Sequence, residues 1–144
     1  MTSDLHATVA THLRRVGQRY TTNRRALVGL LEKLGTPVSI PELLQASEGL
    51  AQSSVYRNLA VLEQADVVHR IVTSDDFARY ELAEGLTEHH HHLICSSCGM
   101  VADFTAPDTL ERQVATAMAS VASANGFTAE HHRLDLIGTC ARCS

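Results

Sequence analysis

Four consecutive histidines followed by a Cys-x-x-Cys pair constrain this chain more than any other feature. The run 89–92 precedes Cys95 and Cys98, and a second pair, Cys140 and Cys143, lies at the far end of the sequence. Together the two pairs use all four cysteines. Thiolate and imidazole are ligands that zinc prefers, and Cys-x-x-Cys is a common spacing in zinc sites. We therefore interpret the four cysteines as one closed tetrahedral zinc site.

Other uses of four cysteines fit the sequence less well. Two disulfides would suit an exported protein, but the N-terminus has no apolar run typical of a secretory signal. A redox-active pair is expected in a βαβ unit, which the pattern lacks. The histidines are internal, whereas an expression tag lies at a terminus. A closed zinc site contributes about 10 kcal/mol to folding, enough to decide whether a small domain exists.

Length and charge limit the classes of protein to consider. At 144 residues the chain suffices for one compact domain or two small ones. No apolar run of about 18 residues occurs, so we expect a soluble, cytoplasmic protein with no membrane partner. The net charge is −4, yet five arginines between Arg14 and Arg25 have no acidic residue among them. This basic patch is a candidate DNA-binding surface, although a solvated helix face has the same pattern.

Hydrophobic periodicity divides the chain into a helical first part and a mixed second part. Apolar residues at three- and four-residue spacing predict helices at 4–16, 23–34, 40–47 and 53–65. The β-prone runs 67–72 and 79–82, with turn residues at 73–76 between them, predict a hairpin. Helices followed by a two-stranded wing form a winged helix-turn-helix, in which the helix after the turn enters the DNA major groove. Beyond these, the patterns predict a hinge at 84–88, strands at 91–95, 99–104 and 127–138, and a helix at 106–125.

The histidine run predicts two separate metal sites. Successive side chains of a strand point to opposite faces, so His90 and His92 share one face while His89 and His91 share the other. Each pair needs further ligands. By residue type the candidates are His69, Glu81, Asp103, Glu111, His131 and His132. A small zinc-dependent enzyme is the remote alternative, since neither a His-Glu-x-x-His motif nor a zinc-deaminase motif is present.

Four stretches, in order, resemble one known family. They are Gly-Gln-Arg-Tyr-Thr-Thr-Asn-Arg at 17–24, Ser-Val-Tyr-Arg-Asn-Leu at 54–59, the histidine and cysteine stretch 89–99, and residues 132–143. Together they resemble the ferric uptake regulator family of bacterial metal-dependent repressors, most closely its zinc uptake regulator branch. The resemblance implies an α+β homodimer that binds double-stranded operator DNA, takes no small-molecule substrate and controls metal-homeostasis genes. It implies a winged-helix DNA-binding domain at 1–83, a hinge at 84–88 and a small α/β dimerisation domain with structural zinc at 89–144.

The resemblance also implies roles for individual residues. Structural Zn²⁺ would be held by Cys95, Cys98, Cys140 and Cys143, and a regulatory ion by His69, Glu81, His90 and His92. A possible additional site would use His89, His91, Glu111 and His132. DNA contacts would come from Arg19, Ser53, Ser54, Tyr56 and Arg57. The regulatory metal is expected to be Zn²⁺. The alternative is an iron- or peroxide-responsive regulator using Fe²⁺, because Asp103 matches a ligand of peroxide-sensing members.

Overall fold

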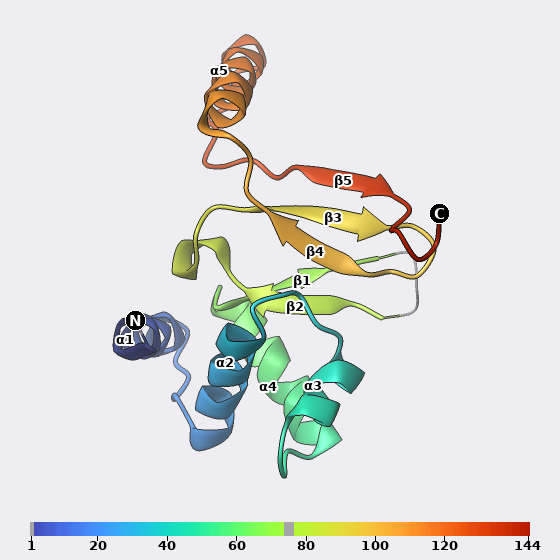
Figure 1. The fold of residues 1–144 in the computed structure, drawn as a ribbon. Coiled ribbons are helices and arrows are strands. Elements are labelled where there is room, and N and C mark those ends of the chain that lie inside the picture. Colours follow the sequence, from blue (N-terminus) through green and yellow to red (C-terminus); the bar gives the residue numbers. More distant parts are fainter. Residues whose placement is uncertain (1, 74–76) are drawn as a thin grey trace.

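The computed structural model of this chain describes residues 2–73 and 77–144, with side chains from residue 4 onward. The elements form two groups, one above the other in Figure 1. The lower group holds α1 (Thr2–Arg15), α2 (Thr22–Leu34), α3 (Ile40–Ala46), α4 (Gln52–Gln64), β1 (Val68–Ile71) and β2 (Arg79–Leu82). A short 3-10 helix, η1 (Glu84–Leu86), leads to β3 (His91–Cys95), β4 (Val101–Phe104), α5 (Asp108–Ala124) and β5 (Asp135–Gly138). Of the turn expected at 73–76, residues 74–76 lie outside the described part.

Local sequence signals set the ends of the helices. The Thr21 side chain accepts a hydrogen bond from the backbone N–H of Arg24 at the start of α2, and Gly35 ends that helix with a φ of 67°. A glycine tolerates this left-handed conformation without steric cost. Ser39 and Glu42 form a capping box that opens α3. The helix positions predicted from the sequence are confirmed to within two residues.

The lower group is a winged helix-turn-helix, as predicted. Strands β1 and β2 pair antiparallel, and Val38 exchanges two backbone hydrogen bonds with Tyr80, of 3.0 and 2.7 Å, as a short third strand. Helices α1, α2 and α4 bury a common apolar core that includes the fully buried Leu13, Leu59 and Leu62. Burial of such a core is the main stabilising term for a domain of this size.

The upper group is a three-stranded sheet with β3 in the centre. It pairs antiparallel with β4 and parallel with β5. The strand predicted over 127–138 is confirmed only at its end, because pairing with β3 begins at Asp135. The strand predicted over 99–104 begins at Val101, because Gly99, with a φ of 77°, lies in the turn after β3. The first difference leaves His131 and His132 in a loop rather than in a strand.

The two groups touch through a small apolar cluster of their own. Ile71 of β1 is 2% exposed and packs with Ile94 of β3 and Val101 of β4. This contact holds the wing against the upper sheet beside the histidines.

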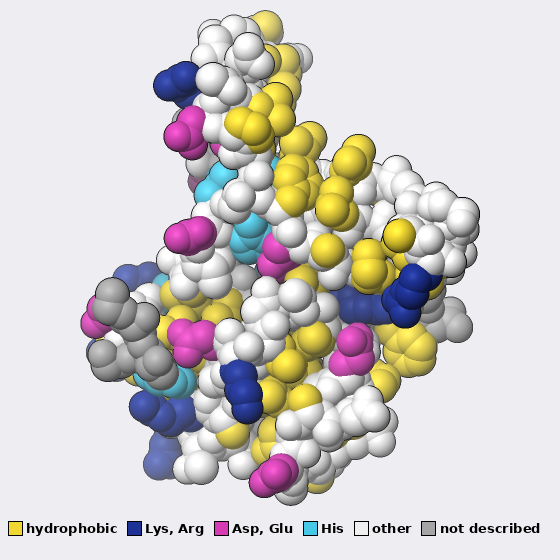
Figure 2. Space-filling model, viewed as in Figure 1, with side chains coloured by type: hydrophobic (Ala, Val, Ile, Leu, Met, Phe, Trp, Pro, Cys, Tyr) yellow, Lys and Arg dark blue, Asp and Glu magenta, His cyan; other side chains and the backbone are white. Residues whose placement is uncertain are grey.

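Helix α5 stands away from the other helices, at the top of Figure 1. Figure 2 shows hydrophobic side chains gathered along this helix and over the sheet below it. The exposed members on these elements are Leu110, Met118 and Val121 of α5, and Leu136 and Ile137 of β5. A contiguous exposed apolar surface of this kind is typical of a protein interface.

Candidate metal centres and nucleic-acid interface

The four cysteines converge at one end of the upper sheet. Cys95 ends β3, Cys98 follows in the next turn, and Cys140 and Cys143 follow β5. The parallel pairing of Cys95 with Gly138 brings the second pair alongside the first. All four are free thiols whose sulfur atoms lie within 4.8 Å of one another. This is the ligand set of a closed zinc site.

The electrostatics of Cys95 favour metal binding. The backbone N–H groups of Cys98 and Cys140 each donate a hydrogen bond of 3.4 Å to its sulfur. These bonds lower the pKa of the Cys95 thiol to about 6. The thiolate is the form that binds metals, so a lowered pKa makes Cys95 easier to deprotonate when the metal binds.

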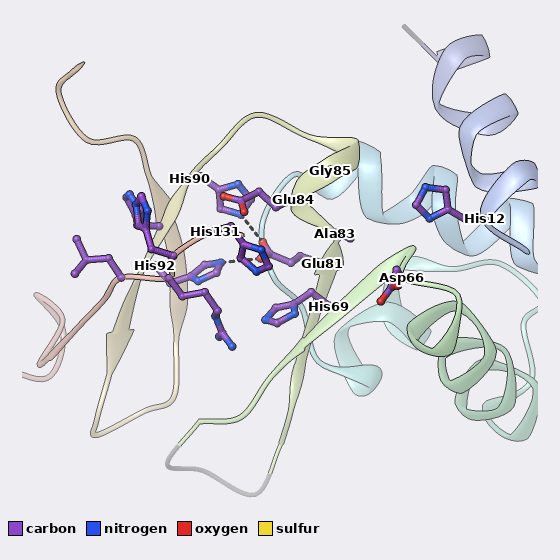
Figure 3. A pocket seen from close by; sticks show the side chains of 14 residues that line it. His12, Asp66, His69, Glu81, Ala83, Glu84, Gly85, His90, His92 and His131 are labelled. Carbon is purple, nitrogen blue, oxygen red and sulfur yellow. Dashed lines mark hydrogen bonds and ion pairs between the residues drawn. The ribbon is translucent and has the colours of Figure 1, made fainter. Parts of the chain in front are cut away.

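The expected alternation of the histidines is present, and one face forms an inner cluster of Glu81, His90, His92 and Asp103. The ligand atoms of the inner cluster lie within 4.8 Å of one another. Glu81 comes from the wing strand β2, and its carboxylate oxygens lie 3.0 Å from His90 Nε2 and 2.7 Å from His92 Nε2. Figure 3 shows the carboxylate of Glu81 between the two rings. The inner cluster therefore joins the two groups of elements.

The structure brings Asp103, rather than His69, into the inner cluster. Asp103 Oδ1 lies 3.6 Å from His92 Nε2, and it is buried without a hydrogen-bond partner. His69 is not within the 4.8 Å group, but it lines the same cavity of about 490 Å³ as Glu81, His90 and His92. Its Nε2 atom is also buried without a hydrogen-bond partner. Both residues thus offer an unused donor atom beside the shared ligands.

The opposite face of the run carries an outer cluster of His89, His91, Glu111 and His132. Glu111 lies in the first turn of α5, and its carboxylate contacts His91 Nε2 and lies 3.1 Å from His89 Nε2. His132 Nε2 is 3.4 Å from the same carboxylate and has no hydrogen-bond partner. All four predicted residues of the additional site therefore lie together.

The donor atoms fit a divalent metal ion. Imidazole and carboxylate are ligands of zinc and of ferrous iron. Buried polar atoms are nearly always hydrogen-bonded, so an unpaired imidazole nitrogen or carboxylate oxygen inside a cluster of ligands fits a site that binds a cation. Such atoms occur at Asp103 in the inner cluster, at His91 and His132 in the outer cluster, and at His69 beside the inner cluster. The two histidine clusters therefore have the chemistry and the unsatisfied donors of metal sites.

The protonation of the inner cluster predicts that thermal stability changes with pH in opposite directions with and without bound metal. Burial opposes charge on His90 and His92, but other contacts raise the pKa of both above 6.5. For His90 these are the backbone carbonyl of Glu88 and the carboxylates of Glu81 and Asp103, and for His92 they are the same two carboxylates. A histidine whose pKa is raised by folding adds stability that is lost as the pH rises through the folded value. The melting temperature of the metal-free chain should therefore fall as the pH rises above 6.5 and through the raised pKa values of these histidines.

The zinc-loaded chain should show the reverse over the same range. Zinc displaces the protons on the ring nitrogens, so its binding strengthens as protons become scarce. Thermal melts with excess chelator and with excess zinc test both directions. If the melting temperature fell equally with rising pH in both series, protons would not compete with zinc for His90 and His92.

The predicted DNA-contacting residues divide into an exposed group and a buried one. Ser53, Tyr56 and Arg57 are exposed on α4, and Arg19 is exposed before α2. Ser54 is only 9% exposed, and its hydroxyl oxygen accepts hydrogen bonds from Asn23 and Asn58. The structure therefore gives Ser54 a packing role between α2 and α4, whereas the family resemblance implied a direct DNA contact.

A buried polar network, which the sequence analysis missed, supports this surface. Arg24 donates a hydrogen bond of 3.0 Å from Nε to Asn58 Oδ1 and one of 2.7 Å from Nη1 to the backbone oxygen of Arg19. Asn58 donates in turn to Ser54. The network holds the loop that carries Arg19 against α4. The sequence did offer a signal for this network: Ser54 and Asn58 are polar residues at inward-facing positions of the amphipathic helix α4.

Replacing Asn58 by alanine should lower the free energy of unfolding by about 1–3 kcal/mol, because buried donors on Arg24 lose their acceptor. Urea denaturation measures the loss. Gln64→Ala, at the exposed end of the same helix, is the matched control. Equal effects of the two substitutions would show that the network adds no stability.

The sequence profile of the Ferric uptake regulator family matches residues 15–137. The chain belongs to the ferric uptake regulator family. It is 31% identical over 138 residues to the peroxide operon regulator of Bacillus subtilis, covering 92% of this chain and 88% of that protein. It is 36% identical over 138 residues to the ferric uptake regulation protein of Campylobacter jejuni, covering 92% and 83%.

The fold agrees with this membership. The structure of the Helicobacter pylori ferric uptake regulator superposes with a TM-score of 0.75 at 26% identity, covering 99% of this chain and 93% of that one. Members of the ferric uptake regulator family are transcription regulators, so the chain is a metal-responsive regulator and not an enzyme. No helix within the described residues is long and apolar enough to cross a membrane.

Proposed function

We propose that this family member is a cytoplasmic, metal-dependent repressor whose regulatory ion is held jointly by the wing and the upper sheet. The observation that carries the proposal is the position of Glu81, a β2 residue whose carboxylate reaches both His90 and His92. These three residues can share one ion only when the two groups of elements lie together. A ligand that binds one arrangement better shifts the population toward it.

The protein acts as a homodimer on double-stranded operator DNA. The exposed apolar side chains of α5 and β5 supply a self-complementary surface of the kind that dimers bury. In a two-fold dimer, the α4 helices meet major grooves one or more helical turns apart, about 34 Å per turn. Tyr56 and Arg57 of α4 face the bases, while Arg19 and Ser53 contact the backbone.

Zinc is the proposed co-repressor metal, with His69 as the wing's second ligand. His69 Nε2 is unpartnered in the cavity shared with Glu81, His90 and His92. Three imidazoles and one carboxylate form a tetrahedral set that zinc favours. The target genes would then serve zinc homeostasis. The cysteine site holds structural zinc, and the outer cluster binds a further ion that fixes the base of α5.

A specific observation favours a second candidate, an iron- or peroxide-responsive regulator. Asp103 lies within the inner cluster, where it would give two carboxylates and two imidazoles. Such an oxygen-rich set suits ferrous iron as well as zinc. Asp103 as the fourth ligand would therefore admit the iron candidate, whereas His69 in that place would favour zinc.

DNA binding with controlled metal content tests the function. Duplexes selected from a randomised library with zinc-loaded protein serve as the probe, and fluorescence anisotropy measures affinity with zinc, with anaerobic ferrous iron and with chelator. Binding that requires zinc supports the first candidate, and binding that requires iron supports the second. Affinity that is unchanged by chelation at the histidine sites would contradict a metal-dependent repressor.

A further inference from the structure

Asp135 lies beside the inner cluster without belonging to it. It is the first residue of β5, and the parallel pairing of β3 with β5 places it opposite His92. Its Oδ1 atom is 3.5 Å from His92 Nδ1. On the other edge of the same ring, Nε2 lies 2.7 Å from Glu81 Oε1. The two nitrogens of one imidazole therefore face two different carboxylates.

We propose that Asp135 is a positioning residue for the regulatory metal site, which holds His92 through Nδ1 and keeps Nε2 directed at the ion. The proposal rests on the proposed function, since it assumes that His92 is a ligand. A ligating histidine commonly donates its other ring N–H to a carboxylate or a carbonyl, which fixes the ring orientation and strengthens the ligand. With Nε2 directed at the ion, the ring proton stays on Nδ1, and this N–H donates a hydrogen bond to the Asp135 carboxylate.

The neighbouring ligand shows the same arrangement with a different acceptor. His90 Nδ1 lies 2.8 Å from the backbone carbonyl oxygen of Glu88, and His90 Nε2 faces Glu81. Each ring thus has Nδ1 toward an acceptor outside the inner cluster and Nε2 toward the carboxylate inside it. Asp135 differs in being a carboxylate, whose side chain is 30% exposed, beside a ring that is only 6% exposed. Electrostatic interactions at such a site are screened less than on the open surface.

Asp135 lies on β5, the strand that leads directly into the second cysteine pair. In the same register, Gly138 lies opposite Cys95, two residues before Cys140. Zinc bound by the cysteines therefore holds β5 in the register that places Asp135 beside His92. The structural ion should have to be present before the regulatory site reaches its full affinity.

Substitution of Asp135 tests this role in the full-length protein loaded with zinc at the cysteines. Asp135→Ala should weaken binding of zinc at the inner cluster about 10- to 100-fold, measured by competition with a chromophoric chelator. Asp135→Asn keeps the shape and a neutral acceptor oxygen, so its loss should be smaller. Glu130→Gln removes one negative charge from the segment before β5 and should bind as the wild type does.

A second readout distinguishes positioning from a general effect on folding. Cobalt bound at the inner cluster should show altered ligand-field absorption in Asp135→Ala. The zinc content of the cysteine site should stay at one ion per chain. Loss of the cysteine-bound zinc in Asp135→Ala, or an unchanged zinc affinity of the inner cluster, would overturn the proposal. A wild-type chain that binds zinc only through its cysteines would instead contradict the proposed function itself.

Discussion

Replacing Cys95 and Cys140, one cysteine from each pair, by serine should abolish zinc binding at the cysteine site and unfold the upper sheet. A closed zinc site contributes on the order of 10 kcal/mol to folding, which is comparable with the whole stability of a small domain. The sheet has little else to hold it, since the buried residues of its apolar cluster are only Ile71, Ile94 and Val101 among the described residues.

Zinc content by mass spectrometry and amide hydrogen exchange measure the two effects. The core shared by α1, α2 and α4 contains no cysteine. Exchange should therefore rise in β3, β4 and β5 while those helices stay protected. Wild-type protein stripped with a strong chelator should reproduce the variant. Retained zinc or a protected β3 in the double variant would show that the cysteines are not the structural site.

Alanine at His90 should remove the effect of metal on DNA affinity while leaving the structural zinc in place. In the proposed regulatory site, Glu81, His90 and His92 hold one ion between the wing and the upper sheet. Loss of His90 should therefore uncouple metal occupancy from the arrangement of the two groups of elements. A coupling of about 1–3 kcal/mol corresponds to a 5- to 150-fold change in affinity. The variant should bind DNA as weakly with zinc as the wild type does with chelator.

The adjacent His89→Ala is the matched control, because its side chain points to the outer cluster on the opposite face. Parallel His69→Ala and Asp103→Ala variants identify the fourth ligand, and DNA affinity measured with each metal identifies the metal. Abolished DNA binding in His89→Ala together with normal binding in His90→Ala would exchange the roles of the two clusters.

Much of the architecture followed from local features of the sequence. Threonine, serine and glycine at the helix ends act through hydrogen bonds and φ values within a few residues, so Thr21, Ser39 and Gly35 mark boundaries that the structure confirms. The alternation of side chains along a strand separates His90 and His92 from His89 and His91 without any tertiary information. Most members of the three groups of candidate metal ligands were likewise predicted from the sequence.

The sequence by itself indicated a set of four cysteine ligands, two faces of histidines and a winged helix, because each of these depends on spacing within short segments. Only the tertiary structure decided several contacts between distant segments. Asp103 enters the inner cluster, Asp135 reaches His92, and Ser54 faces inward, through the pairing of β3 with β4 and β5 and the packing of α2 on α4. Strand register and helix packing are settled by the burial of many side chains together, so no single motif predicts them.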